Sequence, residues 1–374
     1  MTSREVALGM PGLRREAPDP SVPADRPDDP RLVDSFGRVA TDLRVSLTDR
    51  CNLRCTYCMP EEGLDWIEDS RLLTDDEVIR LITVAIDRLG VEEVRFTGGE
   101  PLLRKGLEAI VAATTALRTH TGAVPQTALT TNGLGLARRA AKLAAAGLQR
   151  INVSLDTLDR ARFARITHRD RLDDVLAGLA AAGAAGLGPI KINAVLLRGV
   201  NDDEAVPLLH WAVRHGYQLR FIEQMPLDPQ GAWDRDGMVT AAEILATLRT
   251  EFTLAPDPQH RGAAPAETWL VSSPEPGPAD PVIEGQSPKV GIVGSVTRPF
   301  CGDCDRARLT ADGQLRDCLF ARTETDLRAA LRSGADDEQL AAVWRAAMWL
   351  KRAGHGIDDE SFLRPDRPMS AIGG

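Results

Sequence analysis

A regular alternation of short β-rich runs with longer helical segments occupies the chain from about residue 40 to about residue 224. One helical segment, residues 74–89, begins with the capping box of Thr74 and Glu77 and carries apolar residues at helical spacing. Six such β–α units in series predict a parallel sheet with right-handed crossovers, either a partial barrel or a doubly wound sheet. The predicted strands lie near residues 41–48, 91–97, 126–131, 149–155, 189–197 and 217–224.

Period-two alternation gives four of these strands one apolar and one polar face. The polar faces carry Arg44, Arg95, Ser154 and Lys191, one on each strand. Helices should cover the outside of the sheet, so the polar faces point inward. A barrel interior is normally filled with Val, Ile and Leu, and buried polar groups are costly unless something pairs with them. We therefore expect an α/β fold, a partial (β/α)6 TIM-type barrel, whose lumen surrounds a large polar ligand. The alternative is a sheet with one solvated face.

Six cysteines form two groups of three and occur nowhere else. In a chain without a secretory signal this pattern predicts metal binding rather than disulfides. The spacing of the first group does not fit a zinc finger, which needs paired C-x-x-C motifs or histidines. It fits an iron–sulfur cube that lacks one protein ligand and whose open iron can bind a small molecule. The first group is Cys51, Cys55 and Cys58, and the second is Cys301, Cys304 and Cys318.

The loops after the strands carry the other distinctive sequences. The first strand runs into the cysteine motif, and the second runs into Thr97-Gly98-Gly99-Glu100-Pro101. Glycines allow a ligand to approach the backbone closely, and Glu100 can accept hydrogen bonds from an amino group. The loops after the third and sixth strands hold residues 130–133 and 224–226. All of these loops lie at strand C-termini, where barrel enzymes build their sites.

A hairpin is predicted beside the second cysteine group. Asp312-Gly313 suggests a two-residue turn between residues 306–310 and 314–316. Ideal pairing about this turn sets Cys318 opposite Ala307, within roughly 10 Å of Cys304 at about 3.3 Å per residue. Strict alternation would nevertheless place the two cysteines on opposite faces. A site with three thiolates therefore requires a bulge or a twist.

Two arginines and the chain terminus complete the candidate features. Arg306 and Arg308 share one face beside the second cysteine group and suit a phosphate, although a solvated edge strand would look the same. The net charge of −9 argues against a general nucleic-acid binder, so any anionic ligand must meet a local cluster of arginines. Only five of the 45 basic residues are lysine, so an interior lysine is notable. The terminal Gly373-Gly374 would, by itself, be a frayed end.

The composition divides the chain into four regions. Residues 1–35 are rich in Pro, Asp and Arg and are predicted to be a disordered extension. Residues 36–254 form the barrel, residues 255–289 a Pro-rich insertion or linker, and residues 290–374 a C-terminal region with the second cysteine group. No apolar stretch approaches the roughly 18 residues of a membrane span, and no signal-peptide core is present. We expect a cytoplasmic protein with neither a membrane nor a nucleic-acid partner.

These motifs together resemble a known family. Cys51-x3-Cys55-x2-Cys58 followed by the Gly-Gly-Glu-Pro loop is similar to the radical S-adenosylmethionine enzymes. The second cysteine group, the Arg306-x-Arg308 pair and the terminal Gly-Gly narrow the resemblance to the GTP 3′,8-cyclase family, over about residues 35–374. This resemblance implies two [4Fe–4S] clusters, one on each group of cysteines. It also implies conversion of GTP to 3′,8-cyclo-GTP, after a 5′-deoxyadenosyl radical abstracts the ribose 3′ hydrogen. That reaction is the first step of molybdenum cofactor biosynthesis.

The resemblance also implies roles for individual residues and for partners. The GTP cyclisation would depend on Arg306, Arg308, Gly373 and Gly374, with the terminal glycines reaching into the site. Partners would be an external one-electron donor, cyclic pyranopterin monophosphate synthase as pathway successor, and a second copy in a homodimer. S-adenosylmethionine would be bound by Tyr57, Gly99, Glu100, Ser154 and Met225. GTP would be bound by Arg44, Arg95, Thr130, Lys191, Arg306, Ala307 and Arg308.

Two rival hypotheses remain open at this point. Six thiolates could hold two zinc ions in a binding module, which would carry no iron. A radical enzyme that modifies peptides would also use auxiliary clusters, although it typically has more than three C-terminal cysteines and gives no role to the arginine pair.

Overall fold

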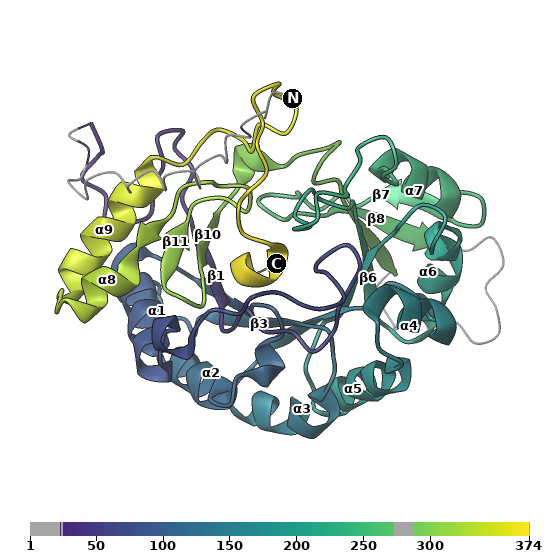
Figure 1. Ribbon diagram of the computed structural model, residues 1–374, viewed down its shortest axis with the longest axis horizontal. Coiled ribbons are helices and arrows are strands. Elements are labelled where there is room, and N and C mark those ends of the chain that lie inside the picture. Colours follow the sequence, from purple (N-terminus) through teal and green to yellow (C-terminus); the bar gives the residue numbers. More distant parts are fainter. Residues whose placement is uncertain (1–22, 24, 273–287, 374) are drawn as a thin grey trace, which may run out of the picture.

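The fold is organised by a curved sheet of parallel strands surrounded by helices (Figure 1). The computed structural model describes residue 23, residues 25–272 and residues 288–373. The six predicted strands are present, and each pairs in parallel with the next. This confirms the partial (β/α)6 barrel. The strands are β1 (Asp42–Ser46), β2 (Glu93–Thr97), β3 (Gln126–Thr131), β4 (Arg150–Ser154), β5 (Ile190–Val195) and β6 (Gln218–Ile222).

Further strands extend both edges of the sheet. Strand β10 (Arg306–Leu309) pairs in parallel with β1, and β9 (Lys289–Val293) pairs in parallel with β6. Strand β10 thus brings the second cysteine group to the β1 edge of the barrel, with Cys301 and Cys304 before the start of β10 and Cys51 beyond the end of β1. Antiparallel strands finish the two ends: β11 (Gln314–Arg316) and β12 (Thr325–Asp326) beyond β10, and β8 (Glu267–Ser272) and β7 (Thr253–Pro256) beyond β9.

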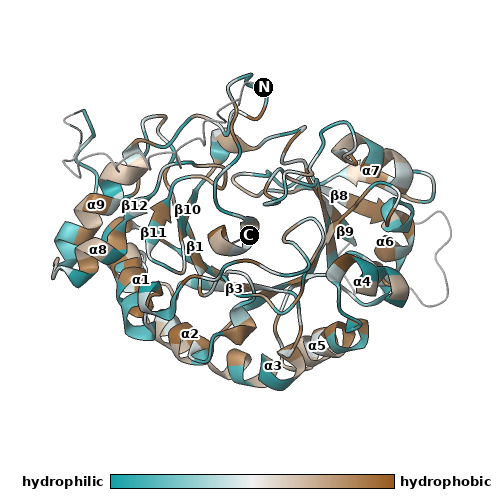
Figure 2. Cartoon of the chain, viewed as in Figure 1, coloured by the Kyte–Doolittle hydropathy of each residue, from teal (hydrophilic) through white to brown (hydrophobic). Residues whose placement is uncertain are grey.

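Amphipathic helices cover the outside of the barrel, and both hydrophilic and hydrophobic residues occur along them (Figure 2). In α1 (Asp75–Leu89) the predicted capping box of Thr74 and Glu77 is present, and Gly90 ends the helix in the left-handed conformation at φ 74°. The other helices are α2 (Leu107–Ala116), α3 (Leu136–Ala145), α4 (Arg160–Thr167), α5 (Leu172–Ala184), α6 (Ala205–Arg214), α7 (Ala241–Leu248), α8 (Leu327–Arg332), α9 (Asp337–Trp349) and α10 (Met369–Ile372).

Two predictions about irregular regions need correction. Residues 1–22 and 24 of the predicted disordered extension lie outside the described residues, but residues 31–35 are part of the fold. Leu32 is fully buried and Val33 forms a β-bridge with Val39. The predicted linker also contains strand β8, whose Thr-Trp-Leu-Val core has high β propensity that the flanking prolines obscured. The rest of that segment, residues 273–287, lies outside the described residues.

The predicted two-residue hairpin turn is also wrong, and the difference changes the face on which Cys318 lies. Arg308 pairs with Arg316, which leaves one more residue in the loop than the predicted turn has. Because side chains alternate along a strand, this shift of one residue reverses the face on which every later side chain lies. Continued past Arg316, the observed register would bring Cys318 to the face of Arg306 and Arg308. The extra residue is Gly313, which adopts the left-handed conformation of a bulge at φ 75°, so the bulge expected from the sequence lies in the turn itself.

Candidate functional site

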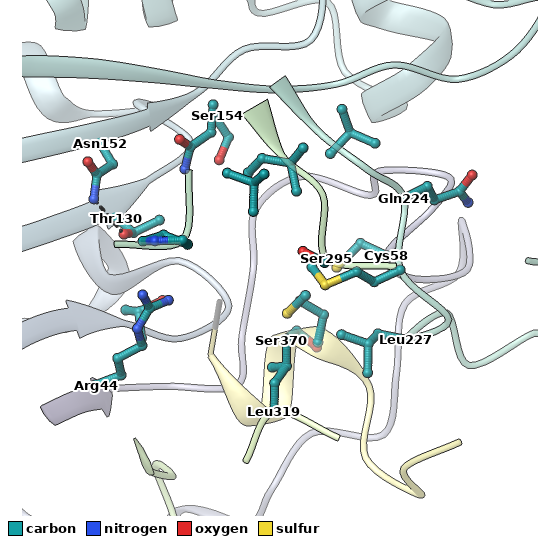
Figure 3. Close-up of a pocket in the computed structure, with 18 of the residues that line it drawn as sticks. Arg44, Cys58, Thr130, Asn152, Ser154, Gln224, Leu227, Ser295, Leu319 and Ser370 are labelled. Carbon is teal, nitrogen blue, oxygen red and sulfur yellow. Dashed lines mark hydrogen bonds between the residues drawn. The ribbon is translucent and has the colours of Figure 1, made fainter. Parts of the chain in front are cut away.

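The lumen of the barrel is a cavity with about 1960 Å³ of empty space, part of it open to solvent, and both cysteine groups line it. Its wall is formed by residues from the inner faces of the strands, from the loops at their C-terminal ends and from the segment that precedes β10. Figure 3 shows Arg44, Thr130 and Asn152 together, across the cavity from Cys58. Predicted site residues that line the cavity are Arg44, Cys51, Cys55, Tyr57, Cys58, Arg95, Gly99, Thr130, Ser154, Met225, Cys301, Cys304, Arg306, Arg308 and Cys318.

One wall of the lumen is a cluster of arginines around the carboxylate of Asp42, with Glu93 paired to Arg95 at 2.7 Å and Asp305 lying 3.8 Å from Arg306. Asp42 lies 3.8 Å from both Arg44 and Arg95 and 3.7 Å from Arg306. Burial alone would raise the pKa of Asp42, but the surrounding guanidinium groups lower it overall. The Nε atoms of Arg44, Arg95 and Arg306 are buried and have no hydrogen-bond partner among the described residues. Because the neighbouring carboxylates leave these three donors unpaired, this wall is suited to an anionic ligand.

The adjoining part of the wall, on β3 to β6, contains a chain of hydrogen bonds. Arg220 donates to Asn193 (2.9 Å) and to Asn152 (3.0 Å), and Asn152 donates to Thr130 (3.2 Å). Burial and the nearby Arg95 lower the pKa of Arg220 to about 9. Arg220 was not among the residues predicted from the sequence. The alternation of β6, where Leu219 and Phe221 are buried on the other face, would have revealed it.

Lys191 lies below this cavity, at the N-terminal end of the barrel. It lines a second cavity with Arg95, Arg150 and Arg220. Burial and these three positive charges lower the pKa of Lys191 to about 8. Arg95, Arg220 and Arg306 line both cavities, so the cationic surface continues from one into the other.

The Gly-Gly motif packs against the start of the first cysteine loop. A Cβ atom on Gly98 would lie 2.4 Å from the carbonyl oxygen of Thr48, and one on Gly99 would lie 2.4 Å from those of Asp49 and Arg50. Gly99 also donates its backbone N–H to Thr48 at 2.7 Å. These glycines therefore allow two backbones to meet, and they fix the loop that carries Cys51.

Glu100 has a different position from the predicted one. Its side chain is fully buried outside the cavity wall, where it accepts hydrogen bonds from the backbone of Leu102 (2.9 Å), the hydroxyl of Thr131 (2.7 Å) and the backbone of Asn132 (2.7 Å). Burial raises the pKa of Glu100 to about 7. The carboxyl group joins the loops after β2 and β3, and Asn132 in turn donates to the sulfur of Cys51 at 3.6 Å.

The rest of the first cysteine loop is fastened to β4 and β5. The hydroxyl of Tyr57 donates to Asp156 at 2.8 Å, and Asp156 accepts from the backbone of Val195 at 2.9 Å. Burial raises the pKa of Asp156 to about 6. Burial is also the main reason that the pKa of Cys55 is raised, followed by the charges of Asp156, Cys58 and Cys51.

Cations surround the second cysteine group. Lys351 donates to the sulfur of Cys304 at 3.4 Å, and Arg306 approaches that sulfur at 3.8 Å. Burial would raise the pKa of Cys304, but these two charges lower it overall. Arg38 donates to the carbonyl oxygen of Cys301 at 2.6 Å and holds the loop from outside. Neither Lys351 nor Arg38 was identified from the sequence, although the rarity of lysine pointed to interior lysines.

The C-terminal segment lies inside the ring of strands (Figure 1). In α10 the backbone N–H of Ser370 donates to the sulfur of Cys58. Arg308 donates to the carbonyl oxygen of Gly373, and a Cβ atom on Gly373 would lie 2.8 Å from Thr97. Gly374 lies outside the described residues. The segment thus contacts one residue from each side of the lumen.

An ion-pair network anchors this tail. Arg367 forms two hydrogen bonds to the fully buried Asp312 in the hairpin turn, at 2.9 and 2.8 Å, and one ion pair with Glu324 at 2.7 Å. Ala307, by contrast, points away from the lumen into the apolar core, so any contact it makes with a ligand must come from its backbone.

The donor set fits two metal clusters. Each group presents three thiols that line one cavity and influence one another electrostatically: Cys55 with Cys51 and Cys58, and Cys304 with Cys301 and Cys318. Three buried thiols that face one cavity are stable as thiolates only beside a compensating metal charge. Within the described ranges, no three His, Cys, Asp or Glu side chains form a group that could hold a single metal ion, so the thiols do not form a mononuclear site.

Comparisons with known proteins agree with this geometry. Residues 45–212 match the Radical SAM superfamily model, and residues 217–357 match the model named Molybdenum Cofactor Synthesis C. The barrel resembles that of Streptococcus suis SuiB, whose structure was determined with bound S-adenosylmethionine. The TM-score is 0.51 and the identity 15%, over 82% of this chain and 68% of that one. This likeness shows the fold alone. The site and the fold together define a radical S-adenosylmethionine protein.

Curated relatives identify the family more closely. A GTP 3′,8-cyclase of Streptomyces coelicolor is 63% identical over 344 residues, which cover 92% of this chain and 96% of that protein. GTP 3′,8-cyclases of Corynebacterium glutamicum (strain R) and Mycolicibacterium smegmatis are 61% and 58% identical, over 92% and 99% of this chain and 89% and 99% of their own lengths. The chain belongs to the GTP 3′,8-cyclase family. In the part of the chain that the structure describes, no helix is long and apolar enough to cross a membrane.

Proposed function

We infer that this protein is a radical S-adenosylmethionine lyase that converts GTP to (8S)-3′,8-cyclo-7,8-dihydroguanosine 5′-triphosphate, the first step of molybdenum cofactor biosynthesis. The observation that carries this function is the single cavity that joins two groups of three cysteines through a wall of arginines. The buried guanidinium Nε atoms without partners are the strongest sign that an anion belongs between the cysteine groups.

The first group, Cys51, Cys55 and Cys58, would hold one [4Fe–4S] cluster. Bound there with S-adenosylmethionine, the cluster supplies the 5′-deoxyadenosyl radical that removes the ribose 3′ hydrogen. Tyr57, Gly99, Ser154 and Met225 line the adjoining part of the cavity and would hold the cofactor. Glu100 would act through the loops that it joins rather than by direct contact, because its carboxyl group is occupied by internal hydrogen bonds.

The arginine wall would bind the triphosphate. Arg44, Arg95 and Arg306 line the cavity and have buried Nε atoms without a hydrogen-bond partner among the described residues. Thr130 and Lys191 would extend this polar surface. Multidentate guanidinium contacts fix the orientation of a phosphate group as well as binding it. Orientation matters here, because the ribose must face the first cysteine group while the guanine faces the second, which would hold the other cluster.

The C-terminal segment would complete the reaction chamber. It lies between Cys58 and Arg308 and carries the buried residues Ser370 and Ile372. A covered chamber protects a carbon radical from water. We propose that Gly373 and Gly374 lie beside the bound substrate, since the space at Gly373 admits no side chain.

We also propose the finer biological setting. Cyclic pyranopterin monophosphate synthase would consume the product, an external one-electron donor would reduce the enzyme, and the protein would act as a cytoplasmic homodimer. The barrel would comprise residues 36–254 and the C-terminal region residues 290–374. The segment between them contributes β8 to the sheet and so is more than a linker.

The deciding experiment is an anaerobic product assay. Reduced enzyme is incubated with S-adenosylmethionine, with and without GTP, and 5′-deoxyadenosine and cyclised nucleotide are measured. We expect both products to depend on GTP and expect about eight iron atoms per chain. A zinc module would contain no iron, and a peptide-modifying enzyme would yield no cyclised nucleotide.

Arginine variants refine this assay. Arg306→Ala and Arg308→Ala should each weaken GTP binding without loss of iron, and Arg322→Ala, a half-exposed arginine, serves as the control. Formation of the same amount of 5′-deoxyadenosine with and without GTP would refute the proposed function.

A further inference from the structure

Lys351 is a buried lysine next to the second cysteine group, and the reaction as described gives it no role. It follows α9 and is only 4% exposed. Its ammonium group donates to the sulfur of Cys304 at 3.4 Å, to the carbonyl oxygen of Cys304 at 3.1 Å and to that of Arg306 at 2.9 Å. A lysine ammonium has three N–H donors, so all three are used within this one segment.

The geometry separates Lys351 from the arginines of the lumen. Arg44, Arg95 and Arg306 have buried donors without partners. Lys351 has no free N–H donor for a ligand, and it does not line the main cavity. Its charge is therefore directed at the cysteine segment rather than at the substrate. Burying a lysine is costly unless it is paired, and its three contacts explain how this cost is met.

The chemistry of the contact suggests a redox role. Hydrogen bonds to the ligand sulfurs and the local net charge are two main determinants of the reduction potential of an iron–sulfur cluster. Reduction adds one negative charge to the cluster. A cation close to a ligand sulfur favours the more negative state and so raises the potential, most strongly where water is excluded.

The first cysteine group lacks such a contact. Among the described residues, its sulfurs accept hydrogen bonds from neutral groups: the backbone of Leu53 and the side chain of Asn132 for Cys51, and the backbone of Ser370 for Cys58. The cation nearest this group, Arg54, donates to the carbonyl oxygen of Cys51 at 2.7 Å and not to a sulfur. The contrast in charge between the two groups is thus built into the fold.

We propose that Lys351 is an electrostatic positioning residue that raises the reduction potential of the cluster on Cys301, Cys304 and Cys318. It also fixes the position of Arg306 relative to that cluster. The bond to the Arg306 carbonyl oxygen fixes the start of β10, from which the Arg306 side chain enters the lumen. A single ammonium group therefore couples the cluster to a residue of the arginine wall. This inference rests on the proposed function, because it takes the second cysteine group to hold a cluster.

The test uses the full-length, anaerobically purified holoenzyme and redox titrations followed by electron paramagnetic resonance, with dithionite as reductant. The signal that GTP perturbs reports the second cluster, and the signal that S-adenosylmethionine perturbs reports the first. Lys351→Met should shift the midpoint of the GTP-sensitive signal to a more negative potential and leave the other unchanged. Lys351→Arg, which keeps the cation, should have a midpoint potential close to that of the wild-type protein. Lys142→Met, on the exposed face of α3, is the matched control.

Each outcome decides the question. Unchanged midpoints in a Lys351→Met protein with full iron content would overturn the inference. If Lys351→Met loses the second cluster, Lys351→Gln replaces it in the test, because glutamine keeps N–H donors but has no charge. A midpoint potential of Lys351→Gln equal to that of Lys351→Arg would overturn the inference. Failure of the proposed function looks different, since the wild-type protein would then lack iron on the second group or make no cyclised nucleotide.

Discussion

The two cysteine sites face the same cavity but differ in the balance of charge around them. The carboxyl groups of Glu100 and Asp156 act on the first site, together with Arg54. Three cations act on the second site, together with the carboxyl group of Asp317: Lys351, Arg306 and Arg308. S-adenosylmethionine is a sulfonium cation, and GTP is a polyanion. The local field therefore favours a different ligand at each site. The ligand specificity of each site therefore depends more on the charged groups around the cysteines than on the thiols themselves.

Removing one cysteine from each site is the strongest way to separate them. Cys55→Ser and Cys318→Ser should each lower the iron content from about eight to about four atoms per chain. Cys55→Ser should abolish formation of 5′-deoxyadenosine, whereas Cys318→Ser should keep binding of S-adenosylmethionine and lose binding of GTP. Iron analysis and equilibrium binding measure both. Equal loss of both ligands in either variant would show that the sites are not distinct.

Deleting Gly373-Gly374 tests the element that touches both sites. Because the segment contacts Cys58 and Arg308 without supplying a thiol, the truncated protein should keep its iron and make no cyclised nucleotide. Arg367→Ala, which removes the anchor to Asp312 but leaves the glycines, should cause a smaller loss of product. Full activity after truncation would mean that the tail is a frayed end.

Gly99→Ala tests how rigidly the first site is held. The added Cβ would lie 2.4 Å from two backbone oxygens, so the cysteine loop must move. Overpacking of this kind costs about 1–3 kcal/mol. Denaturant unfolding should show this loss together with reduced iron at the first site only. Gly183→Ala in α5, where the nearest atom is 3.8 Å away, should keep full iron content and lose no stability, because alanine in a helix is favoured over glycine by about 0.5–1 kcal/mol. A Gly99→Ala protein with wild-type stability would contradict the packing argument.

The pH dependence of GTP binding should report Lys191. Its pKa of about 8 means that the amine is charged below this pH and neutral above it in the free protein. A bound triphosphate favours the charged form, so binding above pH 8 requires proton uptake. Affinity should be constant below pH 8 and then fall by up to about tenfold per pH unit. Isothermal titration at several pH values measures this, and Lys191→Arg should flatten the profile. A profile unaffected by Lys191→Arg would exclude Lys191 from GTP binding.

Much of the fold was predictable, because its signals are local. The capping box at Thr74 and the alternation in β1, β2, β4 and β5 depend on short-range physics and are present as predicted. The hairpin of β10 and β11 was misjudged because Asp-Gly favours a two-residue turn, while Thr310 and Asp312 bond to each other within a longer one. Strand β8 was missed because prolines nearby dominated the local pattern.

The candidate site was predictable only where its residues alternate or form motifs. Arg44, Arg95 and Lys191 are inward-facing strand residues, and alternation alone identified them. Lys351 and Arg38 lie on irregular segments, and their partners are 47 and 263 residues away. No periodicity or spacing encodes such contacts.

By itself, the sequence determined the barrel, the two cysteine groups, the polar inner face and the family, since each depends on spacing along the chain. Only the tertiary structure decided that Cys318 follows the register that would bring it to the face of Arg306, that Glu100 joins two loops and that Lys351 lies against Cys304. Those outcomes depend on strand register and on burial. Both are set by the packing of segments far apart in sequence, where one residue of register or one buried charge changes the result.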